Sequence, residues 1–482
     1  MNRQVCCTLA AIAFFGGGCN MAPQYTRPEA PVPADWPTGS AYRDARSPDD
    51  APAAADLRWQ EFFTDPKLQQ IIETALHNNR DLRLAALNVE KARALYGIQR
   101  AEMLPTVYAA GSASKHRDSA DFVPSGQSRT TELYDVNLGI VSWEIDFFGR
   151  IRNLQEQALQ EYMATEQARR SAQIALVSEV ARVYLTIAAD RGSLNLARST
   201  LETQQGVYNL VLRQYELQVA NEMDRRRAQT QVDTARGDVA RFTQRAAQGH
   251  NALNLLAGSP VQEDLLPTDL ASVTLLRDVF PGLPSEVLLR RPDIMAAEHQ
   301  LEGAYAFMGA VRAAFFPRIG LTTVLGTASD DLSGLFAAGS GTWSFTPLIT
   351  VPIFDSRTWA AHRVSKAVQD IALAQYEKAI QTAFREVADV LAVRGTVDQQ
   401  VAAQQSVVNS AQTIYDLSLK RYTNGIDSYL SVLDAQRSLY GAQQGLIFLH
   451  LARLANEVRV YAVLGGGAED VKLSEVSLKA GD

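Results

Sequence analysis

Two long tracts of the chain combine helical apolar spacing with an absence of proline. No proline occurs from Ser125 through Ser259 or after Pro352, and both tracts are rich in Ala, Gln, Arg, Glu and Leu, which are good helix formers. The pattern predicts helices at 150–217, 223–257, 357–423 and 429–464, with breaks at 218–221 and at Asn424-Gly425. Within the first helix the apolar positions step by three and four, which is typical of a coiled-coil seam; they are Ile174, Val177, Ala181, Tyr184 and Ala188.

A shorter helix and two alternating segments precede each helical tract. The shorter helices are predicted at 81–104, with Asp81 in the first turn, and at 293–315, with Asp293, and a proline follows each. The alternating segments predict two strand pairs, namely 106–115 with 133–147, and 318–328 with 342–354.

The order helix, strand pair, long helices occurs twice because the chain contains an internal repeat. Residues 80–105 match 292–317 at an offset of 212 residues, and Glu179-Val180-Ala181 matches Glu386-Val387-Ala388 at an offset of 207. An ordered series of matches at a nearly constant offset indicates a duplication. The domains predicted are a first repeat at 61–283, a second repeat at 284–467 and a C-terminal tail at 468–482.

The N-terminus has the features of an export signal. Arg3 precedes a short apolar stretch that ends in three glycines and Cys19, which predicts a signal peptide at 1–18. Cleavage before Cys19 would leave a cysteine at the mature N-terminus, resembling a bacterial lipoprotein, although Gly16 stands where lipoproteins usually carry leucine. A plain signal peptide is the alternative. Seven of the 18 prolines lie in 20–58, so 19–60 is predicted to be an extended, lipid-anchored tether.

Composition and charge exclude several classes of protein. The 482 residues carry a net charge of −7, with no basic excess of the kind that binds nucleic acid. All three cysteines, Cys6, Cys7 and Cys19, lie at the N-terminus, and the six histidines are far apart. No HExxH, GxSxG or Walker motif is present. We therefore predict neither an enzyme nor a metal or cofactor site, apart from a covalent lipid on Cys19.

Four strands cannot close a barrel, which needs about eight or more. Several chains that each give four strands to one barrel would remove the exposed strand edges. The long helices carry Arg, Glu and Gln throughout, so they belong in an aqueous compartment. A shared barrel continued by a ring of long helices is a conduit.

In these features the chain resembles the TolC-like outer-membrane efflux proteins, in particular the lipoprotein branch that contains OprM. The segments that carry the resemblance are CNMAPQYTRP, WEIDFFGR, RRPDIMAAEHQL, AAFFPRIGL, RYTNGIDSYLSVLDAQRS and VLGGG. The resemblance implies an α+β membrane protein. It would be a homotrimer with a twelve-stranded barrel in the outer membrane of a Gram-negative bacterium and an α-helical barrel in the periplasm. It would be the passive exit duct of a multidrug pump. Its partners would be a periplasmic adaptor, an inner-membrane transporter of the resistance-nodulation-division type and outer-membrane lipid, not nucleic acid.

The resemblance also points to a gate at the second-repeat turn. Leu430 and Asp434 are four residues apart and share a helix face, so in a trimer they would form an apolar ring and a carboxylate ring. Tyr422 and Asp224 match positions that latch neighbouring helices in the family. The basic latch partner of some relatives is replaced by Asp427, which leaves Arg225, Arg226 or Arg227 as candidates. Asn424 and Gly425 would form the hinge turn.

Two other classes remain as alternatives at this stage. A periplasmic coiled-coil adaptor or structural lipoprotein would also contain long helices, but it would have one hairpin set and no membrane-type strands. A lipid-anchored hydrolase would need a catalytic constellation, which the sequence lacks. The sequence does not indicate which compounds are transported.

Overall fold

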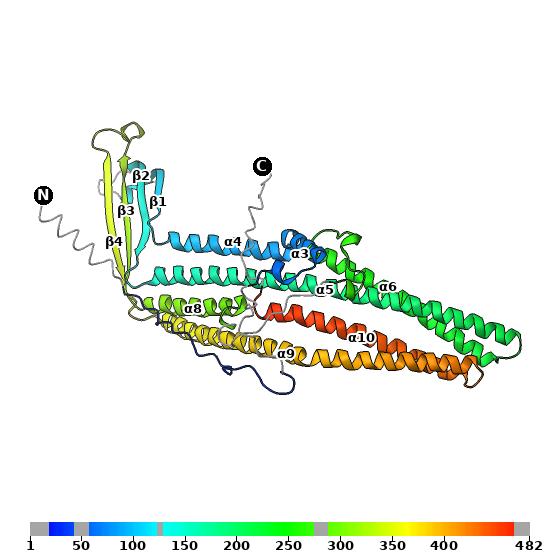
Figure 1. Cartoon of the computed structure of the whole chain (residues 1–482). Helices are drawn as coiled ribbons and strands as arrows, with labels where there is room; N and C mark the ends of the chain where they lie inside the picture. Colours follow the sequence, from blue (N-terminus) through cyan, green and yellow to red (C-terminus); the bar gives the residue numbers. More distant parts are fainter. Residues whose placement is uncertain (1–18, 43–56, 123–128, 274–287, 467–482) are drawn as a thin grey trace. The chain divides into compact units, whose positions relative to one another are not determined.

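The computed structural model describes residues 19–42, 57–122, 129–273 and 288–466 (Figure 1). The predicted signal peptide and the C-terminal tail lie outside the described residues. The chain divides into two compact units. The sheet unit comprises Met1–Glu29, Asn88–Thr165 and Ala296–Tyr376, and the helical unit comprises Ala30–Leu87, Glu166–Met295 and Glu377–Asp482.

The sheet unit contains one antiparallel sheet of four strands in the order β1-β2-β3-β4. The strands are β1 (Val107–Asp118), β2 (Arg129–Ile145), β3 (Arg318–Ser329) and β4 (Gly341–Thr350). Each repeat gives one hairpin, and β2 of the first repeat pairs with β3 of the second. Single-turn 3-10 helices, η2 (Ala120–Phe122) and η5 (Leu332–Gly334), lie in the two hairpin connections. The first hairpin is longer than predicted, because β2 starts at Arg129 instead of residue 133.

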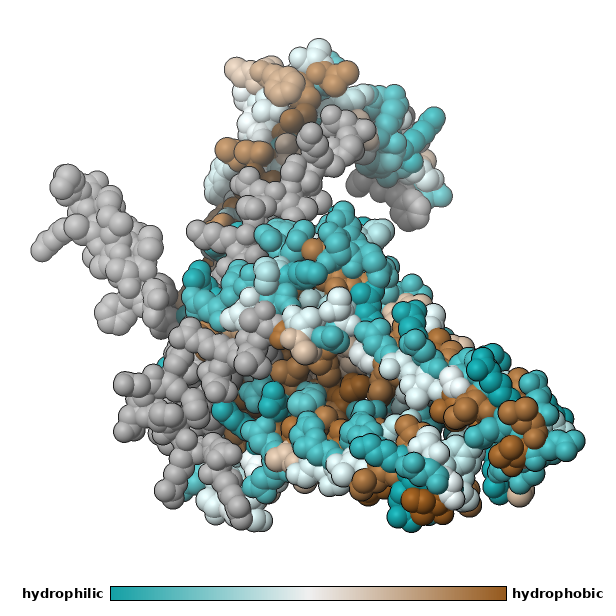
Figure 2. Space-filling view, turned by 45° about the vertical axis from the view of Figure 1, so that its right-hand side comes forward, coloured by the Kyte–Doolittle hydropathy of each residue, from teal (hydrophilic) through white to brown (hydrophobic). Residues whose placement is uncertain are grey.

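One face of the sheet is apolar and the other is polar or small. The register places Leu138 of β2 opposite Leu325 of β3, which in turn lies opposite Trp343 of β4. The other face carries Asp135, Asn137 and their small or polar neighbours. Leu325 is 67% exposed and Trp343 is 78% exposed in the single chain. Figure 2 shows hydrophobic side chains along the sheet, at the top of the view.

A β-bulge keeps the apolar face continuous. Ile140 pairs with Thr323 and Trp143 pairs with Leu321, so β2 has one extra residue at this point. Ser142, at the bulge, has a positive φ of 55°. As a result Trp143 and Ile145, at odd positions, share a face with the even-numbered apolar residues before the bulge.

The helices lie close to their predicted ranges, and the four long ones lie within the proline-free tracts. The shorter ones are α4 (Arg80–Ala101) and α8 (Pro292–Ala313). The long ones are α5 (Arg150–Glu216), α6 (Glu222–Ala257), α9 (Ser356–Thr423) and α10 (Tyr429–Val463). Asp81 lies in the first turn of α4, as predicted. Asn79 caps the helix: its side-chain oxygen accepts a hydrogen bond from the backbone N–H of Leu82 at 2.9 Å.

The core of the helical unit contains two helices that the proline-rich N-terminus did not suggest, α2 (Trp59–Phe62) and α3 (Pro66–Asn78). Asp65 caps α3 by accepting hydrogen bonds from two backbone N–H groups. Phe62 stacks on Tyr461 of α10 at 4.1 Å, and the Tyr461 hydroxyl donates to the Leu57 carbonyl at 2.7 Å. Two 3-10 turns, η3 (Glu263–Leu265) and η4 (Leu270–Ser272), follow α6.

The predicted coiled-coil seam of α5 is buried. Val177, Ala181 and Tyr184 are each at most 2% exposed. Among the described residues, α5 is the one helix with an 18-residue window apolar enough to cross a membrane, and 67% of that window is buried inside the chain's own packing. The seam therefore serves helix packing.

Candidate functional site

The turns that join α5 to α6 and α9 to α10 have the same backbone geometry. In the first, Gln218 has φ 59°, and in the second, Gly425 has φ 73°. The two positions are equivalent in the repeat. Gln218 N donates to Tyr215 O and Val219 N to Gln214 O, and Gly425 and Ile426 make the same two bonds to Tyr422 and Arg421. This is the Schellman ending of a helix, which requires a left-handed residue after its last turn. Glycine provides that conformation without steric cost only in the second repeat.

The second turn is closed by an ion pair. Arg421 donates from Nε to Asp427 Oδ2 at 2.5 Å and from Nη2 to Oδ1 at 3.0 Å. The hydrogen bonds from Arg421 lower the pKa of Asp427. Asn424 Nδ2 also donates to the Lys420 carbonyl at 2.7 Å. Asp427, at the position where a basic latch partner was expected, therefore pairs within its own turn.

Leu430 and Asp434 lie on the first turns of α10, directly after this turn. Leu430 is 45% exposed, and the Asp434 side chain is 59% exposed. Arg437, one turn further along, donates to Asp434 Oδ1 at 2.8 Å. Both side chains are thus accessible at the surface of the single chain, as a ring of three copies requires.

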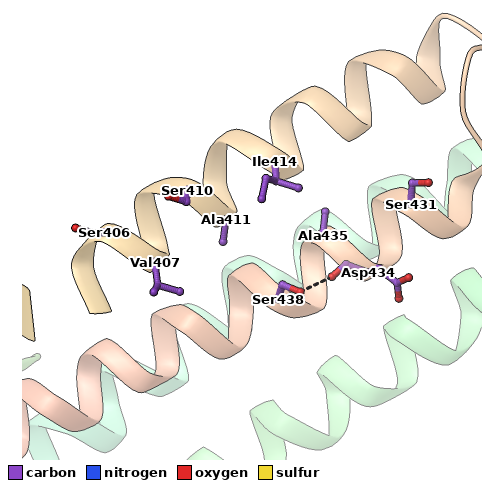
Figure 3. Close-up of a pocket in the computed structure, with 9 residues that line it drawn as sticks. All are labelled: Ser406, Val407, Ser410, Ala411, Ile414, Ser431, Asp434, Ala435 and Ser438. Carbon is purple, nitrogen blue, oxygen red and sulfur yellow. Dashed lines mark hydrogen bonds between the residues drawn. The ribbon is translucent and has the colours of Figure 1, made fainter. Parts of the chain in front are cut away.

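Asp434 borders a groove of small side chains between α9 and α10. Figure 3 shows Ala435 pointing toward α9, whereas the Asp434 carboxylate points away from α9. The Ser438 hydroxyl donates to the Asp434 backbone carbonyl at 2.9 Å. The small residues of the groove are Ser406, Ser410, Ala411, Ser431, Ala435 and Ser438.

The latch candidate Tyr422 has a different partner from the one expected. Its hydroxyl donates to Gln214 Oε1 of α5 at 2.8 Å. Burial raises the pKa of Tyr422, and the charge of Asp224 raises it further, so Asp224 is close enough to act on it electrostatically. Tyr422 packs against Tyr429 with ring centroids 5.4 Å apart. Sequence reasoning missed Gln214, although it is the repeat equivalent of Arg421.

The three consecutive arginines in the first turns of α6 pair with carboxylates of their own helix. Arg227 Nη1 lies 3.7 Å from Asp224 Oδ1, while Arg225 and Arg226 both donate to Glu222. These hydrogen bonds, the strongest from Arg225, lower the pKa of Glu222 to about 2. The structure thus brings Asp224 close to Arg227 and to Tyr422. The Arg227–Asp224 pair lies within α6, however, so it does not join two helices.

The N-terminal arm from Cys19 is docked rather than free. Glu298 of α8 accepts hydrogen bonds from the Tyr25 hydroxyl at 2.9 Å and from Arg27 at 2.6 and 2.8 Å. A Cβ at Gly309 of α8 would lie 2.7 Å from Ala22, so a larger residue would displace the arm. Cys19 is exposed, and its carbonyl lies beside Gly149, just after β2.

No group of three His, Cys, Asp or Glu side chains that could hold a metal ion occurs in the described part of the chain. His299 of α8 lies against α5, with its Nδ1 2.7 Å from Gln160 Oε1.

Comparisons with known proteins agree with this architecture. The family described as outer membrane efflux protein matches residues 71–259 and 283–466, one match for each repeat. The toluene efflux pump outer membrane protein TtgC of Pseudomonas putida is 48% identical over 461 residues, covering 95% of each chain.

Two solved structures have the same fold. A membrane protein from Pseudomonas aeruginosa superposes with a TM-score of 0.87 at 40% identity, covering 93% of this chain and 98% of that one. The open state of the Neisseria gonorrhoeae MtrE outer membrane channel superposes with a TM-score of 0.84 at 37% identity, covering 94% and 99%.

Proposed function

The chain belongs to the outer membrane efflux protein family, and from this premise we propose how it builds and closes its conduit. As a member of the family it is the outer-membrane channel of an efflux pump in a Gram-negative bacterium, and it is not an enzyme. The hypotheses of an adaptor, a structural lipoprotein and a hydrolase therefore no longer apply.

Three copies assemble, each contributing β1–β4 to one barrel of twelve strands. The apolar face of the sheet supports this arrangement, since side chains such as Trp343 and Leu325 are exposed in the single chain and would contact lipid. The unpaired edges of β1 and β4 would pair between copies, which removes the open edges of the sheet. The polar face would then line a water-filled lumen.

The conduit is closed at its periplasmic end by rings of Leu430 and Asp434. One observation carries this proposal: both side chains are exposed and lie one helical turn apart, directly after a turn closed by the Arg421–Asp427 pair. Three leucines would form a dewetted constriction, and three carboxylates would favour cations and share protons. Tyr422, with Gln214 and Asp224 nearby, would hold the helices in the closed arrangement.

Single-channel conductance in a planar bilayer tests the gate. We expect small, cation-preferring currents from the wild type and much larger currents from Leu430→Ala with Asp434→Ala. The matched control is Met223→Ala, because Met223 is the repeat equivalent of Leu430 on α6 and lies outside the proposed rings. Equal conductance in all three proteins would place the constriction elsewhere. An absence of conductance from a folded wild-type trimer would contradict the channel itself.

The duct operates with a periplasmic adaptor and an inner-membrane transporter of the resistance-nodulation-division type, which supplies the energy. The 48% identity to an outer membrane protein of a toluene efflux pump favours organic solvents and other apolar compounds as cargo. Crosslinking in intact cells, followed by mass spectrometry of the captured proteins, would identify both partners.

Cys19 carries the lipid anchor after cleavage of residues 1–18. The docked arm supports this assignment, since it holds an exposed cysteine beside Gly149, four residues beyond the end of β2 at the expected membrane boundary. Mass spectrometry of the purified N-terminal peptide would show a diacylglyceryl group on Cys19. An unmodified peptide that begins upstream or downstream of Cys19 would contradict the assignment.

A further inference from the structure

A cavity of about 300 Å³ lies in the sheet unit where the sheet meets its helices. Its walls combine guanidinium groups with apolar side chains. The cations are Arg150 of α5, Arg318 of β3 and Arg357 of α9, and Phe307 and Val311 of α8 are among the apolar residues. This composition suits a ligand that has both a negative charge and an apolar body.

The charges around the cavity leave one cation without a carboxylate. Arg150 makes two hydrogen bonds of 2.8 Å to Glu144, and Arg357 pairs with Asp355 at 3.0 Å. No ion pair to Arg318 is found among the described residues, and Arg318 is exposed. Its guanidinium is therefore the group available to an incoming anion.

The cavity lies on the polar side of the sheet. Arg318 has the same parity on β3 as Gly320, which pairs with Glu144, whereas Leu321 and Leu325 have the opposite parity. Helix α8 agrees with this placement. At about 100° per residue, its cavity residues Phe307 and Val311 lie on the side opposite Gly309, where the N-terminal arm packs.

We propose that this cavity is a lumenal binding site for amphipathic organic anions, with Arg318 as the residue that binds the charge. The lumenal placement rests on the proposed barrel, in which the polar face of the sheet lines the channel. The binding itself depends only on the cavity. Permeating compounds with a carboxylate or sulfonate beside an aromatic or aliphatic body would pause here, and three copies of the site would surround the conduit.

Calorimetric titration of the purified full-length protein with naphthalene-2-sulfonate tests the binding. We expect Arg318→Gln to weaken binding about tenfold, the loss typical of one charge-assisted hydrogen bond. Arg318→Lys should retain part of the affinity. The matched control is Arg312→Gln, which removes one positive charge from the opposite side of α8 and should leave binding unchanged. Equal affinity in the Arg318→Gln and Arg312→Gln proteins would overturn the site, as would equal binding of uncharged 2-naphthalenemethanol.

Single-channel recording then tests the lumenal placement. In a channel opened by Leu430→Ala with Asp434→Ala, the sulfonate should reduce the current, and Arg318→Gln should relieve this block. A conducting channel that binds the sulfonate but is not blocked would refute the placement. A protein that binds the sulfonate without conducting at all would refute the proposed channel and leave the site intact.

Discussion

Arg27 donates two hydrogen bonds to the carboxylate of Glu298, which lies 271 residues further along the chain. The two bonds are 2.6 and 2.8 Å long, and the Glu298 side chain is only 10% exposed. The Tyr25 hydroxyl donates to the same carboxylate. A carboxylate that is buried with three donors depends on them, since an unpaired buried charge is costly. The pair therefore fastens the N-terminal arm to α8.

Arg27→Ala should lower the thermal stability of the protein and expose the arm to protease. Loss of hydrogen bonds to a charged group costs about 1.5–3 kcal/mol. Arg27→Leu with Glu298→Leu should recover part of the loss, because no buried charge is left unpaired. The control is Arg58→Ala, which breaks an exposed pair with Glu61 and should cost about 0.5 kcal/mol or less. Melting followed by near-UV circular dichroism measures both effects, and equal melting temperatures for the two single variants would refute the fastening role.

Removing a glycine from one helical turn and introducing one into the other should have opposite effects on the stability of the turns. Gly425→Ala should destabilise the second turn by about 1 kcal/mol, because φ is 73° there and a Cβ in the left-handed region costs about 1–2 kcal/mol. No atom lies within 4 Å of that Cβ, so the cost is conformational only. Gln218→Gly should be neutral or stabilising, since it relieves the same strain at φ 59°. Hydrogen exchange of the turn amides distinguishes the two, and faster exchange in Gln218→Gly would contradict this account.

The bulge in β2 predicts which deletions the sheet tolerates. Deleting Ser142 removes the extra residue and leaves Trp143 on the same face as Ile140, so the trimer should still form. Deleting Asn137 shifts the preceding part of β2 by one position and moves Tyr134 and Val136 to the polar face. We expect that variant to lose the trimer, which electrophoresis of unheated and heated samples would show. Trimer loss in both deletion variants, or in neither, would be inconsistent with this register.

The helices were predictable from the sequence because their signal is local and long. For the four long helices, the absence of proline over more than a hundred residues, with helix formers throughout, places the predicted ends within one residue of the observed ones. Helix α3 was missed because residues 66–78 lie before the repeat match and outside the proline-free tracts, although Pro66 suits the first turn of a helix. The change of parity between Ile140 and Trp143 is visible in the sequence and indicates the bulge.

The contacts at the candidate gate were less predictable. The spacing of Leu430 and Asp434 fixes their common face, because helix geometry relates residues four apart. The bond from Tyr422 to Gln214 joins residues 208 positions apart, and it depends on how the turns of the two repeats pack. No periodicity along the chain encodes such a contact. The same holds for Arg27 and Glu298.

Acid should loosen both turns, but only well below neutral pH. The pKa of Asp427 is lowered by Arg421, and that of Glu222 is lowered to about 2 by its arginines. A carboxyl with a lowered pKa stabilises the folded form above its unfolded pKa of about 4, and this stabilisation is lost as pH falls toward the folded value. In an Asp434→Asn background, which removes the gate carboxylate, conductance should be constant from pH 8 to 5 and rise below about pH 4. In the same background, Asp427→Asn should raise the conductance already at pH 7. A change in conductance near pH 6 would disprove this mechanism.

Substitutions at two neighbouring tyrosines distinguish a hydrogen-bonded latch from simple aromatic packing. The Tyr429 hydroxyl is buried with no hydrogen-bond partner in the described structure, whereas the Tyr422 hydroxyl donates to Gln214. Tyr429→Phe removes an unsatisfied group and should be neutral or slightly stabilising, while Tyr422→Phe loses a bond worth about 1 kcal/mol. If Tyr422 holds the gate, Tyr422→Phe raises the open probability about fivefold, since 1 kcal/mol corresponds to that ratio, and Tyr429→Phe does not. Both variants keep the aromatic packing of the pair, so an equal rise in both would show that the aromatic packing, not the hydrogen bond, closes the channel.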